Sequence, residues 1–326
     1  MSKPILHLAP MCNITNRATR EIAKELGCDI TWSEMISSEG LVRQPLANNK
    51  SLALAKKFNK KESPYWVQIF GNNPKNMAQA AKIIEQEIQP TGIDINLGCP
   101  VPKAKKGGYG AIQIGDIAEV VKIIKITKKE ITLPLSLKTR IGLTDPKEIL
   151  EFAPRLEKAG IDQLVVHART LRGMFSEKPN WKIVKKLNNI LNIPIIYNGG
   201  IKTPDDAKFY FKKTGCRNLM IGQAAIGNPW IFQEIKTSKT WPLKYTKQTK
   251  AQIPHEYKQN SIKEKKQTLL KHAELVVKNY DSEKGLIGFR AQLSAYMKTL
   301  QASKHIRKEA TQITSISELK VLLNSF

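Results

Sequence analysis

The sequence contains few cysteines, few acidic residues and no long apolar segment, and each shortage excludes a class of protein. Its four cysteines, Cys12, Cys28, Cys99 and Cys216, have neither the paired spacing of a zinc site nor the pattern of a disulfide framework, so we expect no metal. No apolar run approaches the roughly 20 residues of a membrane-spanning helix. No secretory apolar segment precedes the first predicted strand. We therefore expect a cytoplasmic protein with no membrane partner.

Acidic residues are outnumbered by basic ones. The chain has 28 Asp and Glu against 53 Lys and Arg, which gives a formal net charge of +25 and a pI near 9.8. Binding to a polyanion such as RNA is the simplest explanation of this excess of positive charge. The alternative is an AT-rich genome, which favours lysine in all its proteins. The position of the charge favours RNA, because residues 236–271 contain ten lysines, two glutamates and neither aspartate nor arginine.

The chain also lacks the glycine fingerprint of a dinucleotide-binding open sheet, since the turn at residues 9–13 reads Ala-Pro-Met-Cys-Asn. Short apolar segments alternate instead with amphipathic helical patterns, and most of them end in polar or reactive residues. Eight such strands are expected over residues 5–9, 29–32, 65–69, 93–97, 135–137, 163–166, 193–197 and 218–221. This repetition predicts an α/β protein with a (β/α)8 TIM barrel over residues 1–236.

The last quarter of the chain has a different pattern. Residues 237–262 are rich in lysine, contain Pro242 and Pro254 and show no sustained apolar period, so they read as a linker. Residues 263–326 return to helical periodicity, with three predicted helices and nearly one-signed polar faces. Their apolar stripes include Leu269, Ala273, Val276 and Tyr280, then Phe289, Leu293, Tyr296 and Met297, then Leu319, Leu322 and Leu323 after the capping pair Ser315 and Glu318. A small all-helical domain is expected.

Cys99 is the first candidate catalytic residue. An alternating apolar strand runs directly into Gly98-Cys99-Pro100, and the flanking glycine and proline fix the turn that carries the thiol. A thiol held at the carboxyl end of a barrel strand can act as a proton donor or a nucleophile. A packing role is the alternative, since free cysteines are commonly buried.

Glycines follow the last two predicted strands, as the pair Gly199-Gly200 and as Gly222. Barrels commonly bind a phosphate on these two loops, where backbone N–H groups converge without interference from a Cβ, although a simple turn is the alternative. Gln68, Lys138 and His167 at other strand ends supply an amide, a cation and an imidazole. These groups suit the pyrimidine edge and the phosphate of a flavin, so the pattern predicts an FMN site.

Eight motifs occur in one order over nearly the whole chain. They are Ala9-Pro10-Met11 with Thr15 and Arg20, Glu34-Met35, Gln68-Ile69-Phe70-Gly71, Asn96-Leu97-Gly98-Cys99-Pro100 with Lys103, Lys138-Thr139-Arg140-Ile141-Gly142, His167-Ala168-Arg169-Thr170, Asn198-Gly199-Gly200-Ile201, and Gly222-Gln223-Ala224-Ala225-Ile226-Gly227-Asn228-Pro229-Trp230. Together they resemble the tRNA-dihydrouridine synthases, and within them the bacterial B-type branch.

The resemblance implies an FMN enzyme that reduces the C5–C6 double bond of specific uridines in tRNA, with NADPH or NADH as the electron donor. Hydride would pass from the flavin N5 to uracil C6, and Cys99 would protonate C5 from the opposite face. The resemblance also implies roles for other residues. Pro10, Met11 and Cys12 would line the flavin, Gln68 and Lys138 would contact its ring, His167, Asn198, Gly199, Gly200, Gly222 and Gln223 would hold its phosphate side, and Asn96, Arg140 and Arg169 would hold the uracil and its flanking phosphates. The helical domain would bind tRNA. We expect the protein to be a monomer.

The chain departs from the family pattern near the expected phosphate. Gln223 stands where an arginine is usual, and Gly200 stands where the B-type branch often has aspartate. Without that arginine, the affinity for FMN would depend more on backbone N–H groups.

Three other functions remain open from the sequence. An FMN barrel could act on a free pyrimidine or dihydroorotate, which would not require a basic tail. A barrel lyase could form a Schiff base at Lys138 without any flavin. A barrel that has lost catalysis could bind RNA, and the last two proteins would be colourless.

Overall fold

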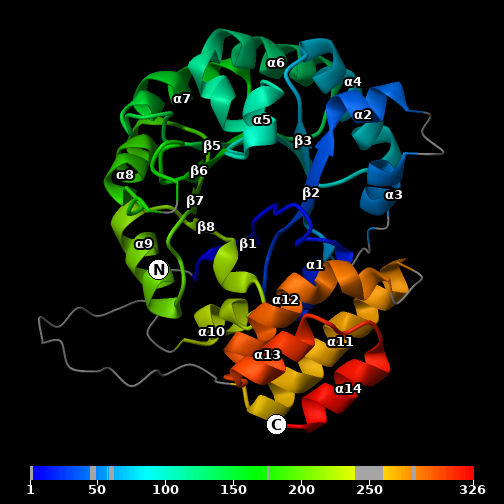
Figure 1. The fold of residues 1–326 in the computed structure, drawn as a ribbon. Helices are drawn as coiled ribbons and strands as arrows, with labels where there is room; N and C mark the ends of the chain where they lie inside the picture. The colour runs from blue at the N-terminus through cyan, green and yellow to red at the C-terminus, as the bar shows by residue number, and fades with distance from the viewer. Residues whose placement is uncertain are drawn as a thin grey trace, which may run out of the picture.

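The computed structural model of the chain contains a β/α barrel followed by a helical domain, and this confirms the predicted fold class (Figure 1). It describes residues 3–44, 49–56, 58, 62–174, 176–238, 260–280 and 284–326. The predicted domain boundaries stay predictions, and residues 239–259 of the predicted linker lie outside the described residues. Within the described part, no helix combines the length and the hydropathy needed to cross a bilayer.

Eight parallel strands form the barrel wall in the order β1-β8-β7-β6-β5-β4-β3-β2. They are β1 (Ile5–Leu8), β2 (Thr31–Ser37), β3 (Tyr65–Phe70), β4 (Gly92–Leu97), β5 (Leu135–Arg140), β6 (Gln163–His167), β7 (Ile195–Asn198) and β8 (Asn218–Ile221). The wall closes between β1 and β2 through one bridge, in which His7 pairs with Ile30. All eight strands therefore point their carboxyl ends to the same rim, where barrel enzymes carry their sites.

Two strands differ from the sequence prediction by more than two residues. The second strand was expected over residues 29–32, but β2 begins at Thr31 and continues to Ser37. Its register against β3 shifts between Trp32 and Met35, so polar residues that read as a strand end lie inside the strand. The fifth strand was expected to stop at residue 137, but β5 runs to Arg140 because its polar residues keep pairing with β6.

Helices cover the outside of the wall (Figure 1). Each presents an apolar face to the strands; α4, for example, begins with Pro74 behind an Asn73 cap and buries Met77, Ala81 and Ile84. The helical segments of the barrel are α1 (Arg17–Glu25), α2 (Ser38–Arg43), α3 (Lys50–Lys56), α4 (Pro74–Ile88), α5 (Pro102–Lys106), η3 (Gly110–Gly115), α6 (Ile117–Glu130), α7 (Glu148–Ala159), α8 (Trp181–Ile190), α9 (Pro204–Thr214), η4 (Gln223–Ala225) and α10 (Ile231–Thr237).

The interior of the barrel is filled by side chains. Trp32 and Trp66 stack with ring centroids 5.2 Å apart, and they form one buried cluster with Val165, Ile196 and Met220. Filling the barrel in this way leaves space for a ligand only toward the rim.

The helical domain contains α11 (Ile262–Tyr280), α12 (Gly285–Thr299), α13 (Lys304–Ala310) and α14 (Ile316–Asn324). The cap predicted at Ser315 is confirmed, because its hydroxyl accepts the N–H of Glu318 at 3.2 Å. The prediction of three helices missed α13, which buries only Ile306 and Ala310 and so gives a weak periodic signal. Tyr280 was expected in the apolar stripe and is instead 42% exposed.

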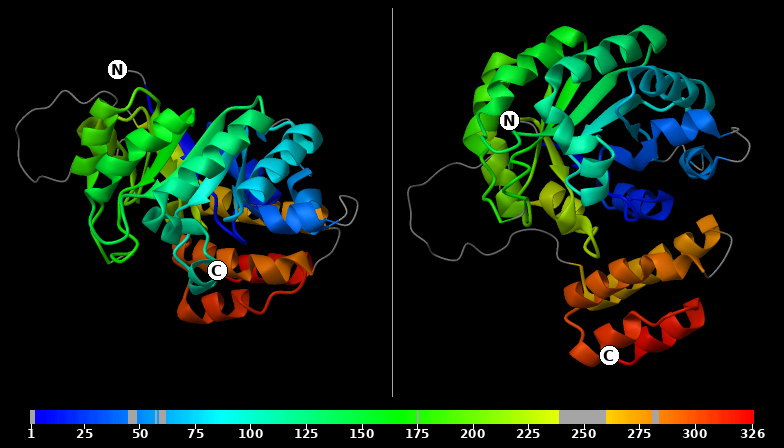
Figure 2. Two further views of the ribbon diagram at one scale, coloured as in Figure 1. Left: turned by 90° about the horizontal axis from the view of Figure 1, so that it is seen from above. Right: turned by 45° about the horizontal axis from the view of Figure 1, so that its top comes forward.

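The helical domain packs against the barrel beside α1 (Figure 2). Ala18 of α1 and Trp230 join the hydrophobic core of the domain, and the Trp230 ring meets Tyr296 edge-on at 5.6 Å. Gly227 has a φ of +64°, and a Cβ there would lie 2.4 Å from backbone atoms of Ala295 and Tyr296. The loop after β8 thus touches the backbone of α12 directly, which only glycine permits.

We predict that Gly227→Ala weakens this contact. The added methyl group would meet backbone rather than a flexible side chain, and the left-handed φ disfavours alanine, so we expect a loss of about 1–3 kcal/mol. The urea midpoint of the full chain, followed by tryptophan fluorescence, measures the effect. The matched control is Gly288→Ala in α12, where a Cβ meets nothing within 4 Å and a gain of up to about 1 kcal/mol is expected. Equal midpoints for Gly227→Ala and the wild type would contradict the prediction.

Candidate active site at the mouth of the barrel

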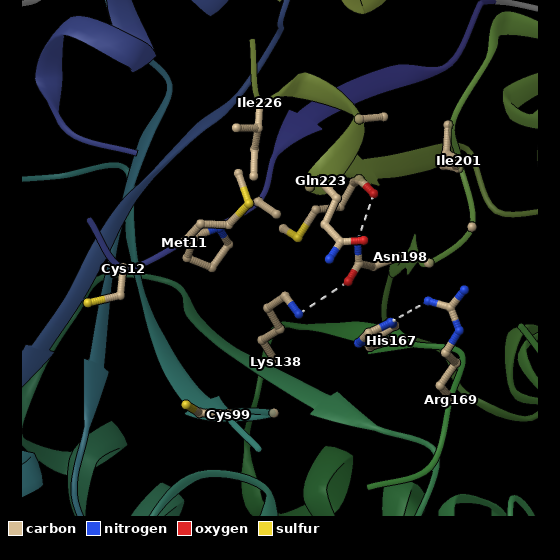
Figure 3. Close-up of a pocket in the computed structure, with 18 of the residues that line it drawn as sticks. Met11, Cys12, Cys99, Lys138, His167, Arg169, Asn198, Ile201, Gln223 and Ile226 are labelled. Carbon is tan, nitrogen blue, oxygen red and sulfur yellow. Dashed lines mark hydrogen bonds between the residues drawn. The ribbon is translucent and has the colours of Figure 1, made fainter. Parts of the chain in front are cut away.

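A cavity of about 670 Å³ opens at the carboxyl ends of the strands (Figure 3). All the residues that the sequence singled out for a site line this one cavity. They are Pro10, Met11, Cys12, Gln68, Asn96, Cys99, Lys138, Arg140, His167, Arg169, Asn198, Gly199, Gly200, Gly222 and Gln223. Cys12 and Cys99 lie on one side, Asn198 and Gln223 lie on the other, and Lys138 lies between them (Figure 3).

Sequence reasoning missed part of this cavity wall. The helical domain contributes Ala295, Lys298 and Thr299, which line the cavity from α12. No periodicity in the sequence could have placed them there, because their position depends on how the two domains pack. Among the lining residues of the described chain there is no carboxylate, whereas five are cationic: Lys138, Arg140, Arg169, Lys202 and Lys298. A cavity of one charge sign attracts anionic ligands.

The turn that carries Cys99 is held from several directions. The Asn96 carboxamide oxygen accepts the backbone N–H of Gly98 at 3.1 Å and of Cys99 at 3.0 Å. Arg140 donates from Nε to the carbonyl of Gly98 at 2.9 Å, and the N–H of Ala111 donates to the carbonyl of Cys99 at 3.1 Å. The thiol is half-buried and faces the cavity on a fixed backbone. Arg140, expected to hold substrate, therefore also holds this turn.

Lys138 and Asn198 connect neighbouring strand ends. The Lys138 ammonium donates to the Asn198 side-chain oxygen at 3.3 Å, and the Asn198 amide donates to the carbonyl of Met220 at 2.8 Å. Burial, followed by the nearby charge of Arg140, lowers the pKa of Lys138 to about 8. The lysine thus stands inside the cavity as a cation whose proton is held less firmly than usual.

His167 is neutral in this environment. Burial and the cations Lys138, Arg140 and Arg169 lower its pKa well below the ordinary value. A guanidinium can only donate, so Nε2 of His167 is the acceptor of the 3.3 Å contact with Arg169. Arg169 also donates from Nε to the carbonyl of Glu177 at 2.6 Å, which fixes its direction.

The glycines after β7 cannot be replaced without strain. Gly199 has a φ of +119°, with His167 3.0 Å from the position of a Cβ. Gly200 has a φ of +74°, and a Cβ there would lie 2.6 Å from both Pro179 and the Tyr210 hydroxyl. An aspartate at position 200 would be strained at this φ and would crowd the side chains of Pro179 and Tyr210. Gly222 after β8 is roomier, because its nearest contacts would be Ala9 at 3.5 Å and Met11 at 3.7 Å.

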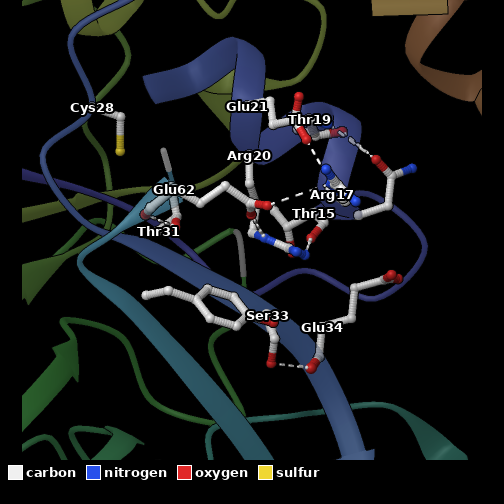
Figure 4. A network of polar contacts seen from close by, with 12 residues as sticks. Thr15, Arg17, Thr19, Arg20, Glu21, Cys28, Thr31, Ser33, Glu34 and Glu62 are labelled. Carbon is white, nitrogen blue, oxygen red and sulfur yellow. Dashed lines mark hydrogen bonds and ion pairs between the residues drawn. The ribbon is translucent and has the colours of Figure 1, made fainter. Parts of the chain in front are cut away.

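A buried ion pair supports the loop after β1 (Figure 4). The Thr15 hydroxyl accepts the N–H of Met11 at 2.9 Å and donates to its carbonyl at 3.1 Å. Arg20 donates to the carbonyl of Thr15 at 2.9 Å and pairs with Glu62 at 2.6 Å, and its guanidinium lies 4.7 Å from the ring centroid of Tyr65. Breaking a buried pair leaves an uncompensated charge, so this cluster holds the loop firmly against β3.

Asp94 of β4 is a further polar residue that sequence reasoning did not select. It is fully buried, and its Oδ2 accepts from the Gln68 amide at 2.6 Å. Its other oxygen makes no hydrogen bond of normal geometry within the described residues, although the Ser136 hydroxyl faces the carboxyl and favours its charged form. Burial raises the pKa of Asp94 to about 7. The alternation of apolar residues in this strand indicates that the Asp94 side chain points into the barrel. It does not indicate that Gln68 on another strand is its hydrogen-bond partner.

Comparison with known proteins adds the family. The family model "Dihydrouridine synthase (Dus)" matches residues 7–325. A probable tRNA-dihydrouridine synthase of Aquifex aeolicus is 31% identical over 96% of this chain and 92% of its own length. tRNA-dihydrouridine synthase B of Pasteurella multocida is 32% identical over 98% and 92%, and that of Vibrio parahaemolyticus is 37% identical over 71% and 70%.

A solved structure of histamine dehydrogenase from Rhizobium sp. 4-9 has a similar fold. It aligns with a TM-score of 0.55 and 12% identity over 71% of this chain and 45% of that chain. This likeness supports the barrel fold alone. Within the described residues, no group of three or more His, Cys, Asp and Glu side chains is arranged to hold a metal ion.

We predict that Asp94→Asn alters the pH dependence of stability. The pKa of Asp94 rises from 3.8 in the unfolded chain to about 7 in the folded protein, so between these values the folded state holds a proton that the unfolded state has released. The resulting stabilisation is complete below pH 3.8 and is lost as the pH rises to about 7. Asp94→Asn should therefore unfold at a higher temperature than the wild type at pH 8. The gap should shrink by pH 5, as measured by calorimetry, and a gap that is constant with pH would contradict the assignment.

Proposed function

The chain belongs to the dihydrouridine synthase family, in its bacterial B-type branch, and we propose that it reduces specific uridines of tRNA to 5,6-dihydrouridine. FMN is the proposed flavin, and NADPH or NADH is the proposed electron donor. The observation that carries this proposal is the convergence of the candidate residues on one cavity, with a rigidly held thiol on one side and a glycine cradle on the other.

The cavity fits the flavin in size and chemistry. Its volume of about 670 Å³ lies in the range of cofactor pockets. Gly199 and Gly200 line the cavity on the loop after β7, one of the two loops on which barrels commonly bind phosphate, and the cationic Lys138 can face the ring edge that becomes negative on reduction. Bound FMN would supply the hydride that the protein itself cannot provide.

The side chains of the protein perform the remaining steps. Cys99 holds a proton on Sγ and donates it to C5 of the uracil, and its partial exposure allows the thiol to be protonated again from solvent. Arg140 and Arg169 face the same cavity and can hold the uracil and its flanking phosphates. The neutral His167 can donate a hydrogen bond from Nδ1 without adding a further positive charge.

An RNA substrate agrees with the charge of the molecule. The cavity lining has five cations and no carboxylate among the described residues, and the chain has a net charge of +25. A target uridine must leave its stack to reach the barrel mouth, and phosphate contacts can offset this cost of a few kcal/mol. Lys298 places one cation of the helical domain at the cavity wall. We propose that the enzyme works on tRNA in the cytoplasm as a monomer.

Two alternatives are weaker. A Schiff-base lyase would use the lowered pKa of Lys138, but the family assignment provides no support for that chemistry. A flavin enzyme for a free pyrimidine would leave Lys298, the cation that α12 supplies to the cavity wall, without a purpose.

We predict that Cys99→Ala separates the two half-reactions. The variant should keep a flavin absorption spectrum and reduce the flavin with NADPH at nearly the wild-type rate. Dihydrouridine formation in tRNA should fall by about 10²–10⁴-fold, the usual loss when a general acid is removed. Stopped-flow absorbance follows the first half-reaction, and nucleoside mass spectrometry follows the second.

The matched control for this experiment is Cys216→Ala, because Cys216 is buried outside the cavity. The control should retain both half-reactions. A Cys99→Ala enzyme that modifies tRNA at the wild-type rate would make Cys99 a packing residue, and a wild-type protein that binds no FMN would overturn the proposed cofactor.

A further inference from the structure

Three polar side chains connect the barrel interior to the Cys99 turn. Asp94 Oδ2 accepts from Gln68 Nε2 at 2.6 Å, Gln68 Oε1 accepts from Asn96 Nδ2 at 2.8 Å, and Asn96 Oδ1 accepts from the N–H groups of Gly98 and Cys99 at 3.1 and 3.0 Å. The three residues are 9% exposed or less. They lie side by side on β3 and β4, with Gln68 paired to Asp94 in the sheet register.

We call this chain of hydrogen bonds from Asp94 through Gln68 and Asn96 the relay. The donor and acceptor ends of each amide in it are fixed. The two N–H groups of the turn require an oxygen from Asn96, so the Asn96 nitrogen must face Gln68. Gln68 must then present its oxygen to Asn96 and its nitrogen to Asp94. Each carboxamide has one donating and one accepting end, so reversing any member would set two donors or two acceptors against each other. Because Gln68 then donates toward position 94, the residue there must offer a hydrogen-bond acceptor.

The carboxyl of Asp94 is costly for the fold. Burial raises its pKa to about 7, and one of its oxygens makes no hydrogen bond of normal geometry within the described residues. The groups that face it from the two neighbouring strands are Gln68 of β3, and Ser136 and Lys138 of β5, of which Lys138 alone is charged. A buried group that lowers stability and touches a site is more readily explained by function than by packing.

We propose that Asp94 is a positioning residue, which orients the amides of Gln68 and Asn96 and thereby holds the Cys99 turn in its active geometry. This inference deepens the proposed function, because it assigns the support of the proposed acid. Gln68 keeps one N–H and one lone pair for a bound flavin ring, since its carboxamide has two donors and two acceptor sites. Loss of Asp94 would thus act on the turn that meets the uracil, because Gln68 keeps its hydrogen bond with Asn96.

Alkylation of the cysteines in the purified full-length protein tests this role without relying on turnover. Cys12 and Cys99 line the cavity, while Cys28 and Cys216 are buried, so Cys12 serves as an internal reference for reagent access. Iodoacetamide labelling at fixed pH, read by peptide mass spectrometry, gives the rate at each thiol. In Asp94→Ala we expect the Cys99 rate to change by at least threefold and the Cys12 rate to stay within a factor of 1.5, because only the turn loses its anchor.

The conservative variant distinguishes orientation from packing. Asp94→Asn retains an oxygen that accepts from Gln68, and its new N–H₂ can donate to the Ser136 hydroxyl, so the Cys99 rate should return to within twofold of the wild type. Gln68→Leu breaks the next link and should reproduce the Asp94→Ala change, even if Asp94→Ala does not fold. Wild-type labelling in both Asp94→Ala and Gln68→Leu would overturn the proposal. Equal changes at Cys12 and Cys99, or an Asp94→Asn protein that behaves as Asp94→Ala, would also overturn it.

A kinetic measurement adds a second readout. Asp94→Ala should slow dihydrouridine formation in tRNA about tenfold or more, because the relay ends at the proposed proton donor. Reduction of the flavin by NADPH should stay within threefold of the wild-type rate. Equal slowing of both steps would indicate general damage to the cavity and would contradict the role. The flavin absorption spectrum of the wild type tests the proposed function separately. A wild type without flavin would contradict the proposed cofactor, whereas unchanged Cys99 labelling in the variants would contradict the role of Asp94.

Discussion

The Asn96 side chain is the contact on which the candidate site depends. Its oxygen holds the backbone of the Cys99 turn, and its nitrogen reaches Gln68 in the neighbouring strand. Because β3 and β4 are parallel and in register, these groups meet at the same rim. The thiol therefore takes its direction from the barrel wall, although it stands on a loop.

The cavity is completed by a second structural constraint, the close approach of the loop after β8 to α12. Gly227 allows two backbones to touch, and Ala18 and Trp230 extend the helical core into the barrel. This docking brings Lys298 to the cavity wall. Gln223 carries no charge, and Lys202 and Lys298 are two of the five cations that line the cavity among the described residues. The helical domain thus contributes to the wall of the cavity.

The sequence predicted what local pattern controls. Alternating segments gave the eight strands, and paired glycines and a constrained cysteine identified residues that the structure brings to one cavity. It could not reveal contacts that depend on packing. The partner of Asp94 lies on another strand, α12 reaches the site only through domain docking, and α13 buries too few residues to show a period. β2 extends past Glu34 because its register against β3 shifts between Trp32 and Met35. The polar residues at this shift look like a strand end in the sequence.

A single anaerobic turnover tests the central claim most directly. The purified protein is reduced without excess NADPH, mixed with unmodified tRNA transcript, and followed by flavin absorbance and by nucleoside mass spectrometry. Our account predicts that the flavin absorbance returns and that dihydrouridine forms in a one-to-one ratio to bound flavin. Reoxidation of the flavin without dihydrouridine, or no response to tRNA, would contradict it.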